Sequence, residues 1–235
     1  MSVGLPSGQG LAGIRPRVGI VSSRHRLCEA LLRRLDEAAP LLADQVEAAA
    51  TSGVEFYQVR EPDLDGAALL ALVRALVAVS RGRVRIVVND RADVAAAAGV
   101  GLHLKASSLP VDRLRAWLPV SAWVSRAVHD AAEARNAGAV DALVAGTVHE
   151  TSSKAAGTPS LGMSGLARIV AASARPVFAI GGMTAADWPA VAAAGAAGIS
   201  AIGWVLPRTG EGAGNAVERA MGELRAVVDG RGGVS

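Results

Sequence analysis

Two apolar runs flank an alanine-rich segment toward the end of the chain: Phe178-Ala179-Ile180-Gly181-Gly182-Met183-Thr184, and then Gly195-Ala196-Ala197-Gly198-Ile199-Ser200-Ala201-Ile202. The first run ends in two glycines and the second opens after Gly198, which predicts a strand, a helix and a second, parallel strand. Paired glycines let a backbone approach an anion closely, and a helix that begins after them offers unpaired N–H groups. Gly181 and Gly182 are therefore candidates for a phosphate site, and a plain strand-to-helix turn is the alternative.

The same alternation of a short apolar run with an alanine-rich helical stretch recurs about eight times along the chain. Because parallel strands need long crossovers, this pattern predicts an α/β fold, a closed (β/α)8 TIM barrel, with an open doubly wound sheet as the alternative. In such barrels the loops after strands seven and eight commonly bind phosphate, which favours the phosphate interpretation of the glycine pair. The six earlier strands are expected at residues 17–21, 54–60, 84–88, 101–104, 123–129 and 142–148.

The length suits one domain. We predict a single barrel domain over residues 17–229, with flexible, glycine-containing segments at 1–16 and 230–235. Within the barrel, residues 27–50 have helical periodicity that Pro40 interrupts, which predicts two short helices rather than one.

The composition excludes several classes of protein. The formal net charge is only +3 and the arginines are scattered among acidic residues, so no nucleic-acid partner is expected. No apolar run reaches the ~18 residues of a membrane span, and the first residues lack the apolar core of a signal peptide. The single cysteine, Cys28, excludes an intrachain disulfide and fits a reducing compartment. We therefore expect a cytoplasmic protein without a membrane partner.

Polar and cationic side chains cluster where the predicted strands end. Because all these ends lie on one face of a barrel, they predict a pocket for an anionic substrate, with histidine available to move protons. For any one of them, a structural hydrogen bond is the alternative role. The candidates are Arg60, Asn89, Asp90, His103, Lys105, His129, Thr151, Ser153, Lys154, Gly181 and Gly182.

Five short motifs in this order resemble those of the thiamine phosphate synthase superfamily, over about residues 17–205. That superfamily has two well-known branches: a synthase that joins a pyrimidine pyrophosphate to a thiazole phosphate, and a thiazole tautomerase that resembles it. The resemblance implies a TIM barrel with a phosphorylated thiazole as substrate. The motifs are Gln58-Val59-Arg60-Glu61, Asn89-Asp90-Arg91, Gly101-Leu102-His103-Leu104, Thr151-Ser152-Ser153-Lys154 and Ile180-Gly181-Gly182.

Departures from the synthase pattern favour the tautomerase branch. Pro62 stands where the synthase has a lysine, and Ser108 stands where it has a magnesium carboxylate, which leaves Asp90 as the one clear metal ligand. Residues 125–129 resemble the tautomerase motif that ends in its acid/base histidine. The resemblance therefore implies a thiazole tautomerase-like isomerase with His129 as acid/base and no obligatory cofactor.

The resemblance also implies how the substrate is held. Gly181, Gly182 and the backbone at Ala201 and Ile202 would bind the phosphate, and a homo-oligomer is compatible with this assignment. One alternative is a synthase with Mg²⁺ at Asp90, and another is a catalytically silent barrel that binds a phosphorylated ligand. The remaining substrate contacts would come from Arg60, Asn89, Lys105, Thr151, Ser153 and Lys154.

Overall fold

A computed structural model describes residues 15–150 and 160–230 of the chain. Eight parallel strands follow one another around a closed barrel, and β1 pairs with β8 to complete it. The TIM barrel prediction is confirmed, and the open doubly wound sheet is excluded. The strands are β1 (Arg17–Val21), β2 (Phe56–Val59), β3 (Arg85–Asn89), β4 (Gly101–Leu104), β5 (Val124–Val128), β6 (Ala142–Gly146), β7 (Val177–Ile180) and β8 (Gly198–Ala201).

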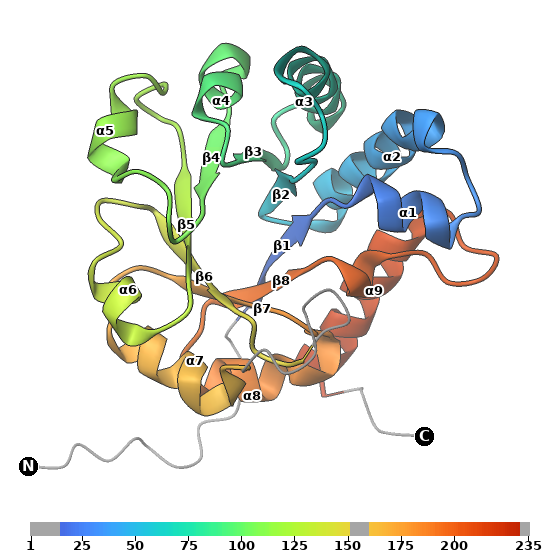
Figure 1. The fold of residues 1–235 in the computed structure, drawn as a ribbon. Coiled ribbons are helices and arrows are strands. Elements are labelled where there is room, and N and C mark those ends of the chain that lie inside the picture. The colour runs from blue at the N-terminus through green and yellow to red at the C-terminus, as the bar shows by residue number, and fades with distance from the viewer. Residues whose placement is uncertain (1–14, 151–159, 231–235) are drawn as a thin grey trace, which may run out of the picture.

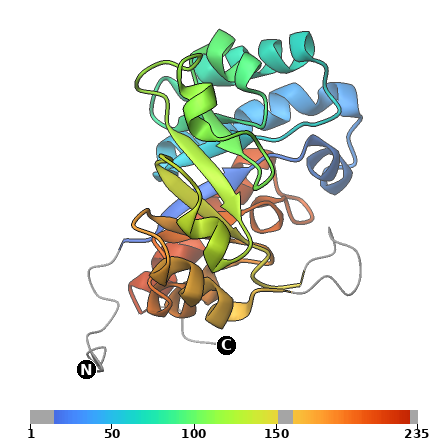
Figure 2. The ribbon, with the colours of Figure 1, turned by 60° about the vertical axis from the view of Figure 1, so that its left-hand side comes forward.

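Helices surround the barrel and connect successive strands (Figures 1 and 2). In the described ranges, no helix has the length and apolar character that a membrane crossing demands. The α-helices are α1 (Arg24–Ala30), α2 (Ala38–Ser52), α3 (Gly66–Ser80), α4 (Ala92–Ala98), α5 (Val111–Arg115), α6 (Ala131–Arg135), α7 (Gly162–Ala171), α8 (Trp188–Ala193) and α9 (Ala213–Val228). Three-residue 3-10 helices lie at η1 (Leu35–Glu37), η2 (Ala185–Asp187) and η3 (Gly203–Val205).

The first crossover contains two α-helices, as predicted, but Pro40 does not separate them. The break lies between Ala30 and Ala38, and Pro40 stands in the first turn of α2. A proline costs little there, because the first N–H groups of a helix have no intrahelical acceptor. The sequence signal of Pro40 therefore marked a helix start.

The barrel interior changes from apolar to polar along the strands. Near the amino-terminal ends, aromatic and aliphatic side chains form a buried cluster, in which Phe56 meets the ring of Phe178 edge to face at 5.2 Å. Strand side chains alternate between the two faces, so the residue two places further on points inward again. Those inner positions are polar near the carboxyl-terminal ends: Gln58, Asn89, His103, Ser125 and Ser200. The polar layer forms the floor of the site.

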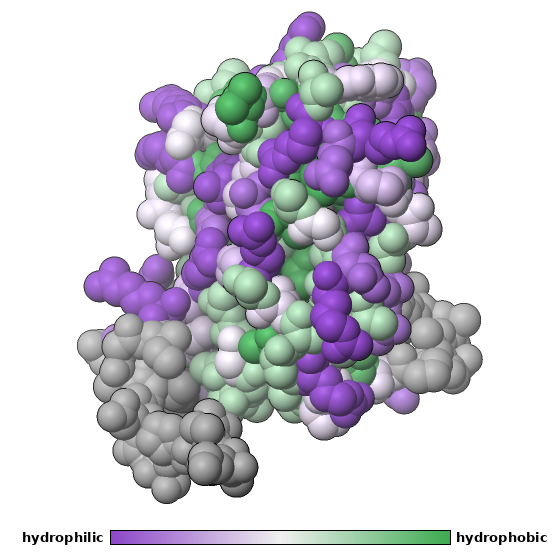
Figure 3. Space-filling model, turned by 90° about the vertical axis from the view of Figure 1, so that its left-hand side faces the viewer, coloured by the Kyte–Doolittle hydropathy of each residue, from purple (hydrophilic) through white to green (hydrophobic). Residues whose placement is uncertain are grey.

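The outside of the barrel is covered by the helices, which bury small and aliphatic side chains against it. On the face at the left of Figure 1, where α5 and α6 lie, hydrophilic side chains are interspersed with weakly hydrophobic ones (Figure 3). On the opposite side, α2 and α9 pack against each other. Their backbones come close, since a Cβ at Gly214 would lie 3.2 Å from the carbonyl oxygen of Asp44.

Candidate active site

A large cavity opens at the carboxyl-terminal ends of β7 and β8. We call it the phosphate cavity; its volume is about 620 Å³. Gly181, Gly182, Ala201 and Ile202, which the sequence singled out for phosphate binding, all line it. Sequence reasoning missed several other lining residues, among them Ser200 from β8 and Arg26 from α1.

The glycine pair is required by the local backbone. Gly181 and Gly182 both have positive φ, +105° and +68°. A Cβ at Gly181 would lie 2.3 Å from Cγ2 of Thr147, and one at Gly182 would lie 2.9 Å from Cβ of His149. No side chain fits at either position without displacing its neighbour. The turn therefore leaves its backbone exposed to the phosphate cavity.

The expected helix N-terminus contributes less than the sequence implied. Only the three-residue η2 and the six-residue α8 follow the glycines, and η3 follows β8. Such short helices have a small macrodipole. What the turns do offer is free donors: within the described ranges, the N–H groups of Gly181, Gly182 and Gly203 have no backbone acceptor.

Ser200 adds a second free polar group. Its side chain is fully buried, and its Oγ has no hydrogen-bond partner among the described residues. Buried polar groups are nearly always paired, and leaving one unpaired costs about 1–3 kcal/mol. The hydroxyl lines the phosphate cavity, so a ligand there would supply the missing partner. Alternation from Gly198 in β8 could have placed this serine inside the barrel, although nothing in the sequence signals its lack of a partner.

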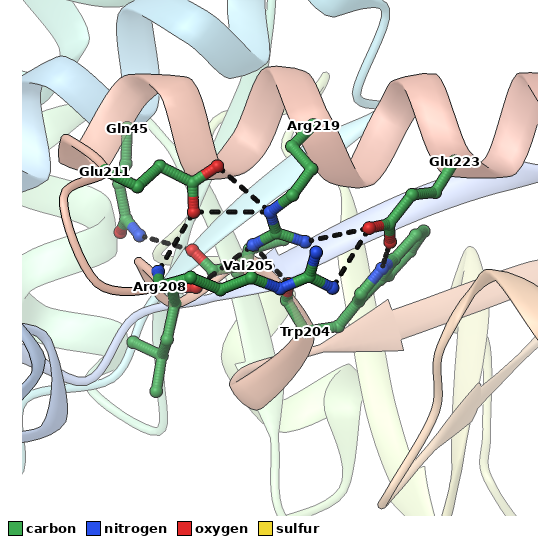
Figure 4. A network of polar contacts seen from close by, with 8 residues as sticks. Gln45, Trp204, Val205, Arg208, Glu211, Arg219 and Glu223 are labelled. Atoms are coloured by element: carbon green, nitrogen blue, oxygen red, sulfur yellow. Dashed lines mark hydrogen bonds and ion pairs between the residues drawn. The ribbon is translucent and has the colours of Figure 1, made fainter.

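The outer wall of the phosphate cavity is held by an ionic network between η3 and α9 (Figure 4). Arg219 donates to Glu211 at 3.0 Å and to the carbonyl oxygens of Trp204 and Leu206. Trp204 Nε1 donates to Glu223 at 2.9 Å. Burial raises the pKa of Glu223, but the hydrogen bond from Trp204 and nearby arginines outweigh it and hold the pKa below its usual value. The charged side chains of this network therefore already have partners within the protein.

The inner polar side chains of β2 to β5 form hydrogen-bonded pairs, although Gln58 Oε1 has no partner among the described residues. Gln58 Nε2 donates to Asn89 Oδ1 at 3.0 Å, and His103 Nδ1 is hydrogen-bonded to Ser125 Oγ at 2.8 Å. Burial lowers the pKa of His103 to about 4, and the charge of Arg60 lowers it as well. His103 is therefore neutral near pH 7. It acts as a hydrogen-bonding group in the floor of the site.

Asp90, the one proposed metal ligand, has both carboxylate oxygens engaged. Lys105 Nζ lies 2.7 Å from Oδ2, and the hydroxyl of Ser108 donates to Oδ1. Burial raises the pKa of Asp90, but the hydrogen bonds from Lys105 and Ser108 outweigh it and keep the pKa below its ordinary value. Asp90 and Lys105, together with Asn89, line a second cavity of about 160 Å³.

The residues around Asp90 do not fit a magnesium ion. Mg²⁺ demands several oxygen ligands in near-octahedral geometry, usually including carboxylates. The nearby carboxylate of Glu61 is buried and accepts hydrogen bonds from the hydroxyl of Ser22 and the backbone of Arg24. Residues 15–150 and 160–230 contain no group of three or more His, Cys, Asp and Glu placed to hold a metal. The ammonium group of Lys105 lies beside Asp90, so a cation of the protein already neutralises this carboxylate.

The remaining candidates are dispersed. His129 is half-exposed, its Nδ1 lies 3.0 Å from Glu133, and it shares a third cavity of about 540 Å³ with Lys105. Arg60 is exposed at the end of β2 and makes no ion pair within the described part of the chain. Thr151, Ser153 and Lys154 lie outside the described residues. The candidates with positions therefore divide between the phosphate cavity and the strand ends of β2 to β5.

Comparisons with known proteins show the family to which this chain belongs. A family model described as Thiamine monophosphate synthase matches residues 33–205. The chain belongs to this family. A thiamine-phosphate synthase of Anaeromyxobacter dehalogenans is 39% identical over 69% of this chain and 74% of its own length. One of Azorhizobium caulinodans is 37% identical over 72% of this chain and 82% of its own.

A solved structure supports the fold assignment. Thiamine phosphate pyrophosphorylase from Pyrococcus furiosus superposes with a TM-score of 0.71, covering 92% of this chain and 97% of that one. At 24% identity, this likeness bears on the fold. The shared architecture extends over nearly all of both chains.

The expectation of a tautomerase-like isomerase is wrong. The related sequences carry the name thiamine-phosphate synthase, which is a transferase, and the family model has the same name. The error came from three local features: Pro62 in place of a lysine, Ser108 in place of a magnesium carboxylate, and the resemblance of residues 125–129 to a tautomerase motif. The acid/base role of His129 was expected only as part of the tautomerase reaction, so that expectation has lost its basis.

Proposed function

We propose that this protein is a thiamine-phosphate synthase, a transferase that joins hydroxymethylpyrimidine pyrophosphate to a thiazole phosphate and releases pyrophosphate. Membership of the family and the names of the relatives support this reaction class. The observation in the molecule that carries it is the phosphate cavity. There, free backbone donors and the unpartnered hydroxyl of Ser200 meet at the ends of β7 and β8.

The two substrates would occupy different sides of the barrel mouth. The thiazole phosphate would bind with its phosphate in the phosphate cavity, on the amides of Gly181 and Gly182 and the backbone at Ala201 and Ile202. The pyrimidine pyrophosphate would lie over the ends of β2 to β4. There Arg60 and Lys105 offer positive charge, and Asn89 offers an amide. Thr151, Ser153 and Lys154 are proposed as further contacts on the strength of the family motif.

The chemistry asked of the protein is positioning and charge neutralisation. The bond that forms joins the two rings, and the bond that breaks releases pyrophosphate with its electron pair. Holding two reactants in line is worth up to about 7–11 kcal/mol of barrier. Lys105 and Arg60 would stabilise the charge that develops on the leaving group. His103 is neutral, so it adds no charge to the floor and can donate or accept a hydrogen bond there.

The test is a two-substrate assay with purified protein. Incubation with hydroxymethylpyrimidine pyrophosphate and thiazole phosphate should form thiamine phosphate and pyrophosphate in equal amounts, and neither should form when one substrate is omitted. Product should be followed by chromatography and pyrophosphate by a coupled assay. If both substrates bind in calorimetry but no product forms, the protein is a binding barrel without this activity.

A further inference from the structure

The basic residues of α1 face two different neighbours. Arg24 forms ion pairs with Glu61 at 3.5 Å and with Asp63, and His25 Nε2 lies 2.8 Å from Asp63. Both therefore face the loop after β2. Arg26 instead reaches the loop after β8, where its Nη2 would lie 3.4 Å from a Cβ built on Gly203. Figures 1 and 2 both show α1 beside the segment that connects β8 to α9.

Arg26 differs from the other arginines of the phosphate cavity in having no acid partner. Arg208 lies 3.0 Å from Glu223, and Arg219 lies 3.0 Å from Glu211 (Figure 4). Arg26 makes no ion pair or side-chain hydrogen bond within residues 15–150 and 160–230, although it is half-buried and lines the cavity. Glu150 also lines the cavity, and it makes no ion pair with Arg26. A half-buried guanidinium without a carboxylate is available to an anionic ligand.

A second, independent feature of the same cavity also calls for a ligand. Ser200 is fully buried and its hydroxyl has no partner in the described part of the chain. The cavity therefore contains a free cation on one wall, and a free hydroxyl and free backbone donors on the others. A phosphate monoester, with two charges and three terminal oxygens, would satisfy all three kinds of group.

We propose that Arg26 is the charged residue that binds the phosphate of the thiazole substrate, from the first βα loop across to the backbone around Gly203. The identity of the ligand rests on the proposed function, but the binding of a phosphate group by Arg26 does not. Neutral donors from a glycine turn discriminate weakly between a phosphate ester and the free alcohol. The guanidinium supplies that selectivity, because its interaction depends on the ligand's charge.

The test measures binding without turnover, by titration calorimetry with inorganic phosphate and with thiazole phosphate. Arg26→Ala should weaken both by about tenfold to a hundredfold, since hydrogen bonds to charged groups are the strong ones. It should leave affinity for the dephosphorylated thiazole alcohol unchanged. Arg26→Lys keeps the charge but loses the planar fork, so it should fall between the wild type and Arg26→Ala. If Arg26→Ala fails to fold, Arg26→Lys provides the test in its place.

Arg83→Ala is the matched control, because Arg83 is exposed and precedes β3, at the opposite end of the barrel. Its phosphate affinity should equal that of the wild type. In the synthase assay, Arg26→Ala should raise the KM for thiazole phosphate and leave the KM for the pyrimidine pyrophosphate unchanged. Equal phosphate affinity in the wild type and Arg26→Ala would overturn the proposal, and so would a wild type that binds no phosphate.

The outcomes separate this inference from the proposed function. Phosphate affinity that depends on Arg26, in a protein without synthase activity, would support the inference and remove the function. Synthase activity with a KM for thiazole phosphate that is insensitive to Arg26→Ala would do the reverse.

Discussion

The phosphate cavity and the group we call the paired cluster are both polar, yet they differ in how far their groups are satisfied. The paired cluster consists of Gln58, Asn89, Asp90, His103, Lys105, Ser108 and Ser125; each side chain has a partner in the cluster, and Gln58 Oε1 is its one buried atom without a partner among the described residues. In the phosphate cavity, Ser200 and Arg26 have no partner among the described residues. Unpaired buried groups reduce stability, which is why we propose that a ligand pairs with those in the phosphate cavity.

The contrast also bears on charge. Asp90 already has the ammonium group of Lys105 beside it, so the charges of these two residues cancel before any substrate arrives. Arg26 has no such counter-ion within residues 15–150 and 160–230. An anion could therefore bind beside Arg26 without breaking an ion pair. To bind a substrate oxygen, Lys105 would have to leave Asp90 or contact both groups at once. The following predictions test this difference, in order of decreasing effect.

Gly182→Asp should abolish binding of phosphorylated ligands, with a loss of roughly a hundredfold or more, because like charges brought together cost several kcal/mol. The new Cβ would also lie 2.9 Å from Cβ of His149. Calorimetry with inorganic phosphate measures the effect. Gly53→Asp is the control, since Gly53 also has positive φ (+81°) but no atom within 4 Å of a Cβ. Unchanged phosphate affinity in Gly182→Asp would show that phosphate does not bind in the phosphate cavity.

Acid should destabilise the protein through His103 in the paired cluster. Its pKa is about 4 in the folded state and about 6.5 when unfolded, so folding favours the neutral ring. Its contribution is complete above pH 6.5 and is lost as pH falls toward 4, by about 1.4 kcal/mol per pH unit and about 3 kcal/mol in all. Urea unfolding at a series of pH values measures it. His103→Asn should flatten the curve in this window, and an equal slope in both proteins would contradict the assignment.

Two buried serines, one in each region, should respond to alanine in opposite ways. Ser200→Ala removes an unpaired hydroxyl, so it should raise the free energy of unfolding by about 1 kcal/mol and weaken phosphate binding severalfold. Ser125→Ala leaves the ring of His103 without its partner, so it should lower stability by about 1–2 kcal/mol. Phosphate affinity should not change in Ser125→Ala. Equal stability changes in the two variants would erase the distinction between the regions.

Removal of magnesium should have the smallest effect. With both oxygens of Asp90 engaged and Ser108 in place of a carboxylate, residues 15–150 and 160–230 offer too few oxygen ligands for a tightly held dication. A chelator should therefore change the synthase rate by less than about twofold, a difference under 0.5 kcal/mol in the barrier. Initial rates with and without chelator, followed by added magnesium, provide the measurement. A rate that collapses and then returns with magnesium would show that Lys105 gives way to a metal.

Much of the fold could be predicted because its determinants are local. The period of the apolar runs fixes each strand, and glycines such as Gly181 mark backbone turns that only glycine tolerates. The error at Pro40 is of the same kind, since a proline signals a helix boundary without saying on which side the helix lies. The enzyme class could not be predicted from local features, because Pro62, Ser108 and residues 125–129 favour the tautomerase branch whereas the relatives that match most of the chain are named synthases.

The sequence alone determined the barrel strands, the end of the barrel at which the polar side chains gather, and the position of the glycine turn at Gly181 and Gly182, because each follows from periodicity or backbone geometry within a few residues. Only the tertiary structure decided which polar groups pair. Lys105 meets Asp90 across two strand ends, and Arg26 lies beside Gly203, from which about three quarters of the chain's length separates it. Pairing depends on distances that barrel closure creates, and closure brings β1 against β8. No local pattern contains that information.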